Sequence, residues 1–140
     1  MPRHPLIDQL LFTRAEFIRA IRGVSAEDAQ ERLLPMNCLS WNVGHLAWQE
    51  QKYFLDYAES IVLFPDIAKE FAFGAPASTP SLEKVLTAWK TITKATNPWL
   101  DRLTSAVSMN VGSDGPPFLG GFRADWWDDT TIESASAFRR

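Results

Sequence analysis

The sequence predicts an all-α fold, a helical bundle with three long helices and a fourth that is short or atypical. Apolar residues recur every three to four positions along three stretches, at about residues 6–22, 41–61 and 81–104. Proline and glycine punctuate the chain between them. A length of 140 residues is that of one domain around a single core. We therefore expect the bundle core at residues 1–111 and an atypical C-terminal segment of the same domain at residues 112–140.

The first predicted helix, at about residues 6–22, has an apolar face and a polar face. The pattern leaves Arg14 and Arg19 for water, and Gly23 ends the helix. Its apolar positions are Leu6, Ile7, Leu10, Leu11, Phe17, Ile18 and Ile21.

A short helix is predicted next. Ser25 is typical of an N-cap, because the acidic residue Asp28 follows three positions later. We expect this helix to run through Leu34 and to end at Pro35.

The second long helix is predicted to begin with Ser40 as N-cap and to end near residue 61. His45 lies opposite its broad apolar face, flanked by Trp41 and Trp48. A helix with two such faces suits a bundle in which each helix touches two neighbours. The broad face comprises Val43, Leu46, Ala47, Tyr53, Phe54, Tyr57, Ala58 and Ile61.

The third long helix follows a loop-like stretch in which residues 66–71 are expected to form one helical turn. Its N-cap is Ser81 or the residues just before it. Pro98 interrupts the pattern and Asn97 is a suitable new N-cap, so we expect a kink or a restart there. Across the bundle we expect these side chains to be buried: Leu10, Phe17, Val43, Phe54, Leu86 and Trp89.

Charge and composition exclude several classes of protein. The formal net charge of −3 and the absence of a clustered basic face argue against a nucleic-acid partner. No apolar run approaches the ~20 residues that span a bilayer, and the N-terminus lacks the apolar region of a signal peptide. The single cysteine, Cys38, cannot form an internal disulfide, which fits a reducing cytosol. We therefore expect a cytoplasmic protein with no membrane and no nucleic-acid partner.

His45 is the first candidate for chemistry. It lies near the start of a helix, where the positive end of the helix dipole suits a neutral ring that can bind a metal. The alternative is a structural or surface histidine, because one imidazole alone holds a transition metal poorly. His45 is the one candidate metal ligand, and no residue is assigned a catalytic or cofactor-binding role.

Glu50 and Cys38 are the other candidates in the bundle. Glu50 is predicted near the middle of the apolar face, where a carboxylate needs a partner such as Arg14 or Lys90, a proton or a cavity. A buried ion pair is favoured over a catalytic acid. Cys38 precedes a helix N-terminus, which can activate a thiol, but no base is near in sequence. A buried, inert thiol is the favoured interpretation.

The segment after Gly112 shows no helical pattern longer than one or two turns. Its acidic residues Asp125, Asp128 and Asp129 do not match a calcium loop, so a solvated tail is favoured. Two adjacent glycines at 120–121 lack the Lys and Ser/Thr of a phosphate-binding loop.

Four short motifs resemble the DinB superfamily, over about residues 5–111. They are Leu6-Ile7-Asp8-Gln9-Leu10, Leu34-Pro35-Met36-Asn37, Gly44-His45-Leu46-Ala47 and the stretch from Pro80-Ser81-Leu82 to Trp89. The resemblance implies an up-down-down-up four-helix bundle, often dimeric. Characterised members are similar to thiol-dependent transferases or hydrolases that use a divalent metal such as zinc or nickel.

The resemblance also implies a metal site formed by His45 and a His-x-x-x-His pair on the last helix. This chain has no histidine after position 45, so only His45 carries over and the site is incomplete. Loss of most of the fourth helix is expected to expose part of the third helix and to favour a homodimer. The residues expected to be exposed are Leu82, Trp89, Ile92 and Leu103.

Three functional hypotheses follow. The first is a DinB-like metal-dependent enzyme that takes further ligands from Glu50, the terminal acids or a second subunit. The second is a non-enzymatic helical module that binds a small apolar ligand or dimerises through aromatic surface. The third is a product whose C-terminus is altered, for example by a shifted reading frame, and which retains no activity.

Overall fold

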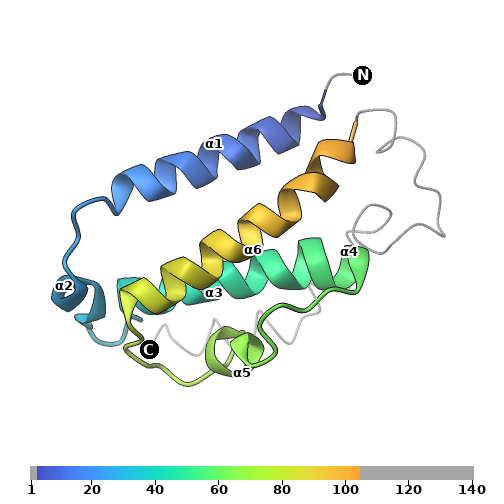
Figure 1. The fold of residues 1–140 in the computed structure, drawn as a ribbon. Coiled ribbons are helices and arrows are strands. Elements are labelled where there is room, and N and C mark those ends of the chain that lie inside the picture. Colours follow the sequence, from blue (N-terminus) through green and yellow to red (C-terminus); the bar gives the residue numbers. More distant parts are fainter. Residues whose placement is uncertain (1–2, 105–140) are drawn as a thin grey trace, which may run out of the picture.

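The computed structural model describes residues 3–104, and nearly all of its regular structure is helical (Figure 1). Within these residues, β-structure is limited to one bridge between Arg3 and Thr104. The all-α class is therefore confirmed for the part of the chain that the structure describes. The expected fourth helix and the segment at residues 112–140 lie outside the described residues. No helix between residues 3 and 104 combines the length and apolar character needed to cross a bilayer.

Three long helical stretches appear where the apolar periodicity predicts them. They are α1 (Pro5–Ala20), α3 (Leu39–Gln51) with its continuation, and α6 (Leu82–Arg102). Shorter helices lie between them: α2 (Ala26–Gln30) and α5 (Ile67–Phe71). In Figure 1 the chain runs one way along α1 and the opposite way along both α3 and α6.

The core lies mainly where α3 packs against α6. Its largest fully buried apolar side chains are Val43, Leu55, Val85, Ile92 and Leu100. The helix α1 closes one side of this core through apolar side chains at both of its ends. Near its start Ile7 packs with Trp99 and Leu100, and near its end the Phe17 ring meets Trp89 edge-on, with ring centroids 5.7 Å apart.

Burial follows the prediction in part. Of the six side chains expected in the core, Val43 and Trp89 are buried, whereas Leu10, Phe17, Phe54 and Leu86 are only half-buried. The expectation of an exposed face on the third helix is wrong. Leu82, Trp89 and Ile92 are 8%, 5% and 0% exposed, and Leu103 is half-buried. Most of this face is buried because Leu82, Trp89 and Ile92 belong to the same core cluster as the buried side chains of α3.

Two of the three predicted N-caps are confirmed. The Ser25 hydroxyl accepts from the Asp28 amide at 3.0 Å, and the Ser81 hydroxyl accepts from the Lys84 amide at 3.5 Å. Ser40 is not an N-cap, since α3 begins at Leu39 after an extended Cys38. The Ser40 side chain is fully buried within the first turn, where its hydroxyl lies 3.3 Å from the Cys38 sulfur.

The boundaries of the shorter elements agree with the prediction except at the C-terminal end of α2. Gly23 adopts a left-handed conformation with φ of 85° just after α1, as expected of a helix stop. The helix α2 ends at Gln30 rather than Leu34. The Gln30 side-chain amide donates to the carbonyl of Thr79 at 2.7 Å, which ties the end of α2 to the start of the third helix. The single turn predicted at residues 66–71 is confirmed as α5.

The second long helix contains a π-helical segment that the sequence pattern did not predict. After Gln51 the chain forms η1 (Lys52–Asp56), followed by a last turn, α4 (Tyr57–Glu59). A π-helix has more residues per turn, so it rotates every later side chain relative to an α-helical register. As a result Leu55 is fully buried, while Tyr57 and Ile61, assigned to the apolar face, are each 41% exposed.

Pro98 does not restart the third helix. The helix α6 continues through Pro98 to Arg102 with no new cap. The residues just after it, Trp99 and Leu100, are 8% and 1% exposed, so tertiary packing holds the last turn despite the missing amide hydrogen.

Candidate functional site

His45 lies in a cluster of aromatic rings on α3, as the sequence predicts. Its imidazole stacks on Trp41, with ring centroids 5.3 Å apart and planes at 12°, and it lies 5.3 Å from Trp48 on the other side. Phe73, from the loop after α5, meets it edge-on at 4.9 Å. These contacts leave the imidazole half-buried and fix the plane of the ring.

One hydrogen bond determines which ring nitrogen of His45 is free. The Nδ1 atom lies 2.8 Å from the backbone carbonyl oxygen of Phe71. A carbonyl oxygen only accepts, so Nδ1 must carry the proton. In the neutral ring Nε2 then holds the lone pair. A histidine that donates one nitrogen to a carbonyl and offers the other is the arrangement found at metal sites.

Gly44 explains why Phe71 can come so close to α3. A Cβ atom built at Gly44 would lie 2.7 Å from the Phe71 ring, which is closer than real side chains approach. Phe71 itself is 3% exposed. Gly44 therefore makes room for the Phe71 ring while His45 binds the Phe71 carbonyl. The role of Phe71 was not predicted. The sequence signal for it is Gly44 itself, because a glycine inside a helical pattern often marks close packing.

Among residues 3–104, His45 does not belong to a complete set of metal ligands. The described part of the chain contains no group of three or more His, Cys, Asp or Glu side chains that could hold a metal ion. Glu50, which one hypothesis offered as a ligand, is 8% exposed, and both of its oxygens bind Arg14. The other residues proposed as ligands or judged as tail, Asp125, Asp128 and Asp129, lie outside the described residues, as do the glycines at 120–121.

The Arg14–Glu50 pair confirms the predicted buried ion pair and excludes Lys90 as its partner. The guanidinium meets the carboxylate with two bonds, from Nε at 2.7 Å and from Nη2 at 2.5 Å. The same guanidinium donates to the Thr96 hydroxyl at 2.9 Å and to the Asn97 side-chain oxygen at 3.0 Å. The expectation that Arg14 faces water is therefore wrong. Asn97 serves this network from within α6 and caps no helix.

This network links α1, α3 and α6 through one polar cluster inside an apolar core. Burying a lone carboxylate costs free energy. Here the two bonds between Arg14 and Glu50 offset this cost, and the neutral oxygens of Thr96 and Asn97 accept further bonds from the same guanidinium. This geometry supports a structural role, because both oxygens of Glu50 are already bound to Arg14.

Cys38 is buried, as predicted, at 2% exposure. Its sulfur lies 3.3 Å from the Ser40 hydroxyl and 3.4 Å from the Ser78 carbonyl oxygen. Its chemical inertness stays a prediction.

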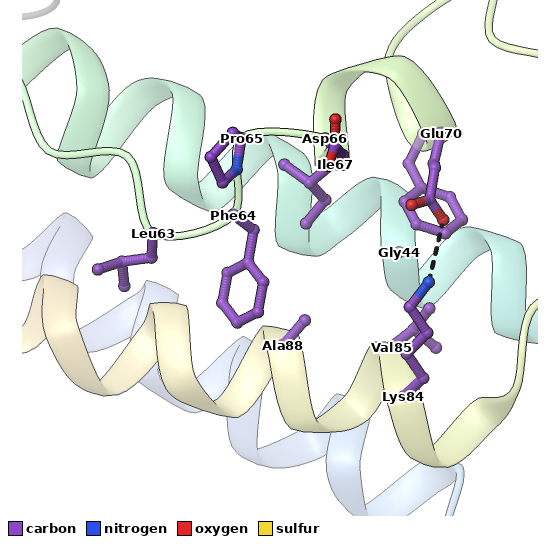
Figure 2. Close-up of a pocket in the computed structure, with 11 residues that line it drawn as sticks. Gly44, Leu63, Phe64, Pro65, Asp66, Ile67, Glu70, Lys84, Val85 and Ala88 are labelled. Carbon is purple, nitrogen blue, oxygen red and sulfur yellow. Dashed lines mark hydrogen bonds and ion pairs between the residues drawn. The ribbon is translucent and has the colours of Figure 1, made fainter.

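A pocket of about 270 Å³ lies between α5, the loop before it, α6 and Gly44 (Figure 2). His45 is not among its lining residues. The pocket was not predicted, because its lining comes from three segments that are distant in the sequence, Gly44, residues 63–71 and residues 84–88. Comparison with models of protein families, with curated proteins and with solved structures finds no match to this chain.

Proposed function

We propose that the chain is a DinB-like helical domain with a partial divalent-metal site, in which His45 supplies one nitrogen ligand. The observation that supports this most is the bond from Nδ1 to the Phe71 carbonyl, which leaves Nε2 as the metal-binding atom. The directions of α1, α3 and α6 also agree with the first three helices of an up-down-down-up bundle (Figure 1).

The proposed site is incomplete within residues 3–104. Zinc sites in proteins normally take three or four protein ligands, and the described residues offer His45 without a neighbouring ligand group. Thiol-dependent transfer or hydrolysis, the chemistry of the family that the chain resembles, needs a metal held firmly enough to activate a thiolate or water. We therefore propose weak metal binding and little activity for this chain.

Metal analysis with NMR tests the proposal. We expect the purified chain to contain far less than one zinc or nickel per molecule. Added Ni²⁺ should broaden the His45 ring signals at millimolar concentration, and His45→Ala should remove this effect while His4→Ala keeps it. One firmly held metal per chain, lost in His45→Ala, would show a complete site instead. An unperturbed His45 ring would end its role as a ligand.

A second candidate function is a non-enzymatic helical module that binds a small ligand or dimerises. The pocket beside α5 favours ligand binding. Dimerisation is favoured by apolar side chains that remain in water. The described residues expose Tyr57, Ile61, Val62 and Leu63 in one continuous part of the chain, each by 41% or more.

A further inference from the structure

The pocket between α5 and α6 is lined mainly by apolar residues and is large enough for a small ligand. Its volume of about 270 Å³ exceeds the ~150 Å³ of a cavity known to hold benzene. It therefore has room for one ring and several further atoms. Its apolar lining residues include Leu63, Phe64, Ile67, Phe71, Val85 and Ala88.

The walls of the pocket are held in place by specific contacts. The side-chain amide of Gln51, 5% exposed, accepts from the backbone amides of Leu63 at 3.0 Å and Phe64 at 2.9 Å. It also donates to the Phe64 carbonyl at 3.0 Å. On the opposite side Gly44 lets Phe71 rest directly on α3. Preformed walls lower the cost of ordering a site when a ligand binds.

The rim of the pocket carries one positive and one negative side chain. Lys84 of α6 reaches across to Glu70 of α5, with Nζ 3.4 Å from Oε2 (Figure 2). The two side chains are 67% and 42% exposed, so water screens this pair and it can open at little cost. Asp66 also borders the pocket, but its carboxylate points away from α6 in Figure 2.

We propose that this pocket binds a small apolar α-amino acid, with its side chain inside and its charged head at the rim. A ligand that carries only a carboxylate is attracted by Lys84 and repelled by Glu70. A ligand that carries only an ammonium is attracted by Glu70 and repelled by Lys84. A head with both charges pairs with both side chains. His45 is not among the lining residues, so the proposal does not rest on the proposed metal site.

Titration of the intact chain with four probes tests the proposal. The probes are L-phenylalanine, 3-phenylpropionate, phenethylamine and glycine, and the readout is the methyl NMR signals of Ile67, Val85 and Ala88. L-phenylalanine should shift these signals at millimolar concentration and bind about threefold more tightly than either singly charged analogue, since each exposed ion pair adds little. Glycine should have no effect.

Three substitutions sharpen the result. Ala88→Leu fills the pocket and should weaken binding by about tenfold or more, whereas Ala68→Leu, the same change at an exposed position of α5, should keep it. Lys84→Met alters only an exposed side chain and should remove the preference for L-phenylalanine over phenethylamine. The proposal is wrong if L-phenylalanine causes no shift, if the three aromatic probes bind equally, or if binding survives in a folded Ala88→Leu protein.

Discussion

Arg14 and Glu50 show how one buried pair can fix the relative placement of three helices. Each side chain has a residue exposure below 10%, and the pair reaches Thr96 and Asn97 on α6. Apolar contacts are non-directional, whereas the paired bonds between Arg14 and Glu50 require a defined geometry. Breaking it from either side leaves a charge in the core without its partner.

We predict that Arg14→Met lowers the free energy of unfolding by about 3–5 kcal/mol, because it leaves the Glu50 carboxylate buried and unpaired. Urea denaturation measures this loss. The double variant Arg14→Met/Glu50→Leu removes both charges and should recover much of it. The exposed pair of Arg19 and Glu16 provides the control, and Arg19→Met should cost far less, because water screens this pair. An equal loss in both single variants would contradict a special role for the buried pair.

Gly44 and His45 are neighbours in sequence that hold the same residue in two ways. Gly44 accommodates the ring of Phe71, and His45 binds its carbonyl oxygen. The position of α5 and the free nitrogen of His45 are therefore coupled. A change at Gly44 should reach His45 through Phe71 and need not touch the imidazole itself.

We predict that Gly44→Ala destabilises the chain by about 1 kcal/mol. Alanine favours a helix by about 1 kcal/mol over glycine, but overpacking against Phe71 costs about 1–3 kcal/mol. Nitrogen NMR of the His45 ring should also show a loosened bond at Nδ1. Asn42→Ala, at an exposed position of the same helix, should leave the His45 ring unaltered and should not destabilise the chain. A stabilised Gly44→Ala protein with an unaltered ring would show that α5 moves freely.

At the level of elements, apolar periodicity predicts the three long helices because each buries one continuous stripe. The stripe locates α1, α3 and α6 within one or two residues at most ends. Caps and breakers are less decisive. Ser40 has the chemistry of an N-cap, yet it is buried in the first turn of α3, and Pro98 lies inside a helix that tertiary packing maintains.

The features that the sequence pattern misses depend on contacts across the fold. No local sequence signal predicts the π-helical segment after Gln51. The Gln51 side chain just before it instead binds the backbone of a later loop, at Leu63 and Phe64. The flanking of His45 by Trp41 and Trp48 follows from helical spacing and was predicted, whereas its contact with Phe73 was not. Its bond to Phe71 depends on a loop closure across 26 residues and was not.

The π-helical segment places Tyr53 where burial and the nearby Tyr57 both raise the pKa of its phenol. Lys52 acts against this shift but does not cancel it. The sequence has only two tyrosines, so tyrosinate absorbance monitors this segment alone. The folded state holds the Tyr53 proton more tightly than the unfolded chain. Stability contributed here is therefore complete below the ordinary tyrosine pKa and falls as the pH rises above it.

We predict that the absorbance titration of the chain includes one phenol that ionises above the ordinary tyrosine range. Tyr53→Phe should remove this component. Tyr57→Phe should move it towards the ordinary value, because one of its causes is lost. Titration in urea, where both rings are exposed, gives the reference. If the high component persists in Tyr53→Phe, its assignment to the partly buried ring is wrong.

For the whole molecule, the structure changes the reason for expecting a dimer. The face of α6 that seemed uncovered is packed against its neighbours, so it cannot form an interface. Exposed apolar side chains occur instead in two continuous stretches, Leu33, Leu34 and Met36 before α3, and α4 with the loop that follows it. The second stretch contains more of them. Tyr57, Ile61, Val62 and Leu63 form this apolar segment, and adjacent exposed apolar residues mark interaction sites more often than scattered ones do.

We predict a homodimer at micromolar concentration that associates through this apolar segment, since a symmetric contact lets one surface cover itself. Light scattering or sedimentation should give twice the mass of the chain. Val62→Glu places a charge at a position that is 48% exposed, and it should shift the equilibrium to the monomer without unfolding the protein. Phe12→Glu makes the same kind of change on α1, at 66% exposure, and should leave the dimer intact. A stable monomer at high concentration, or dissociation by Phe12→Glu alone, would place the apolar segment outside any interface.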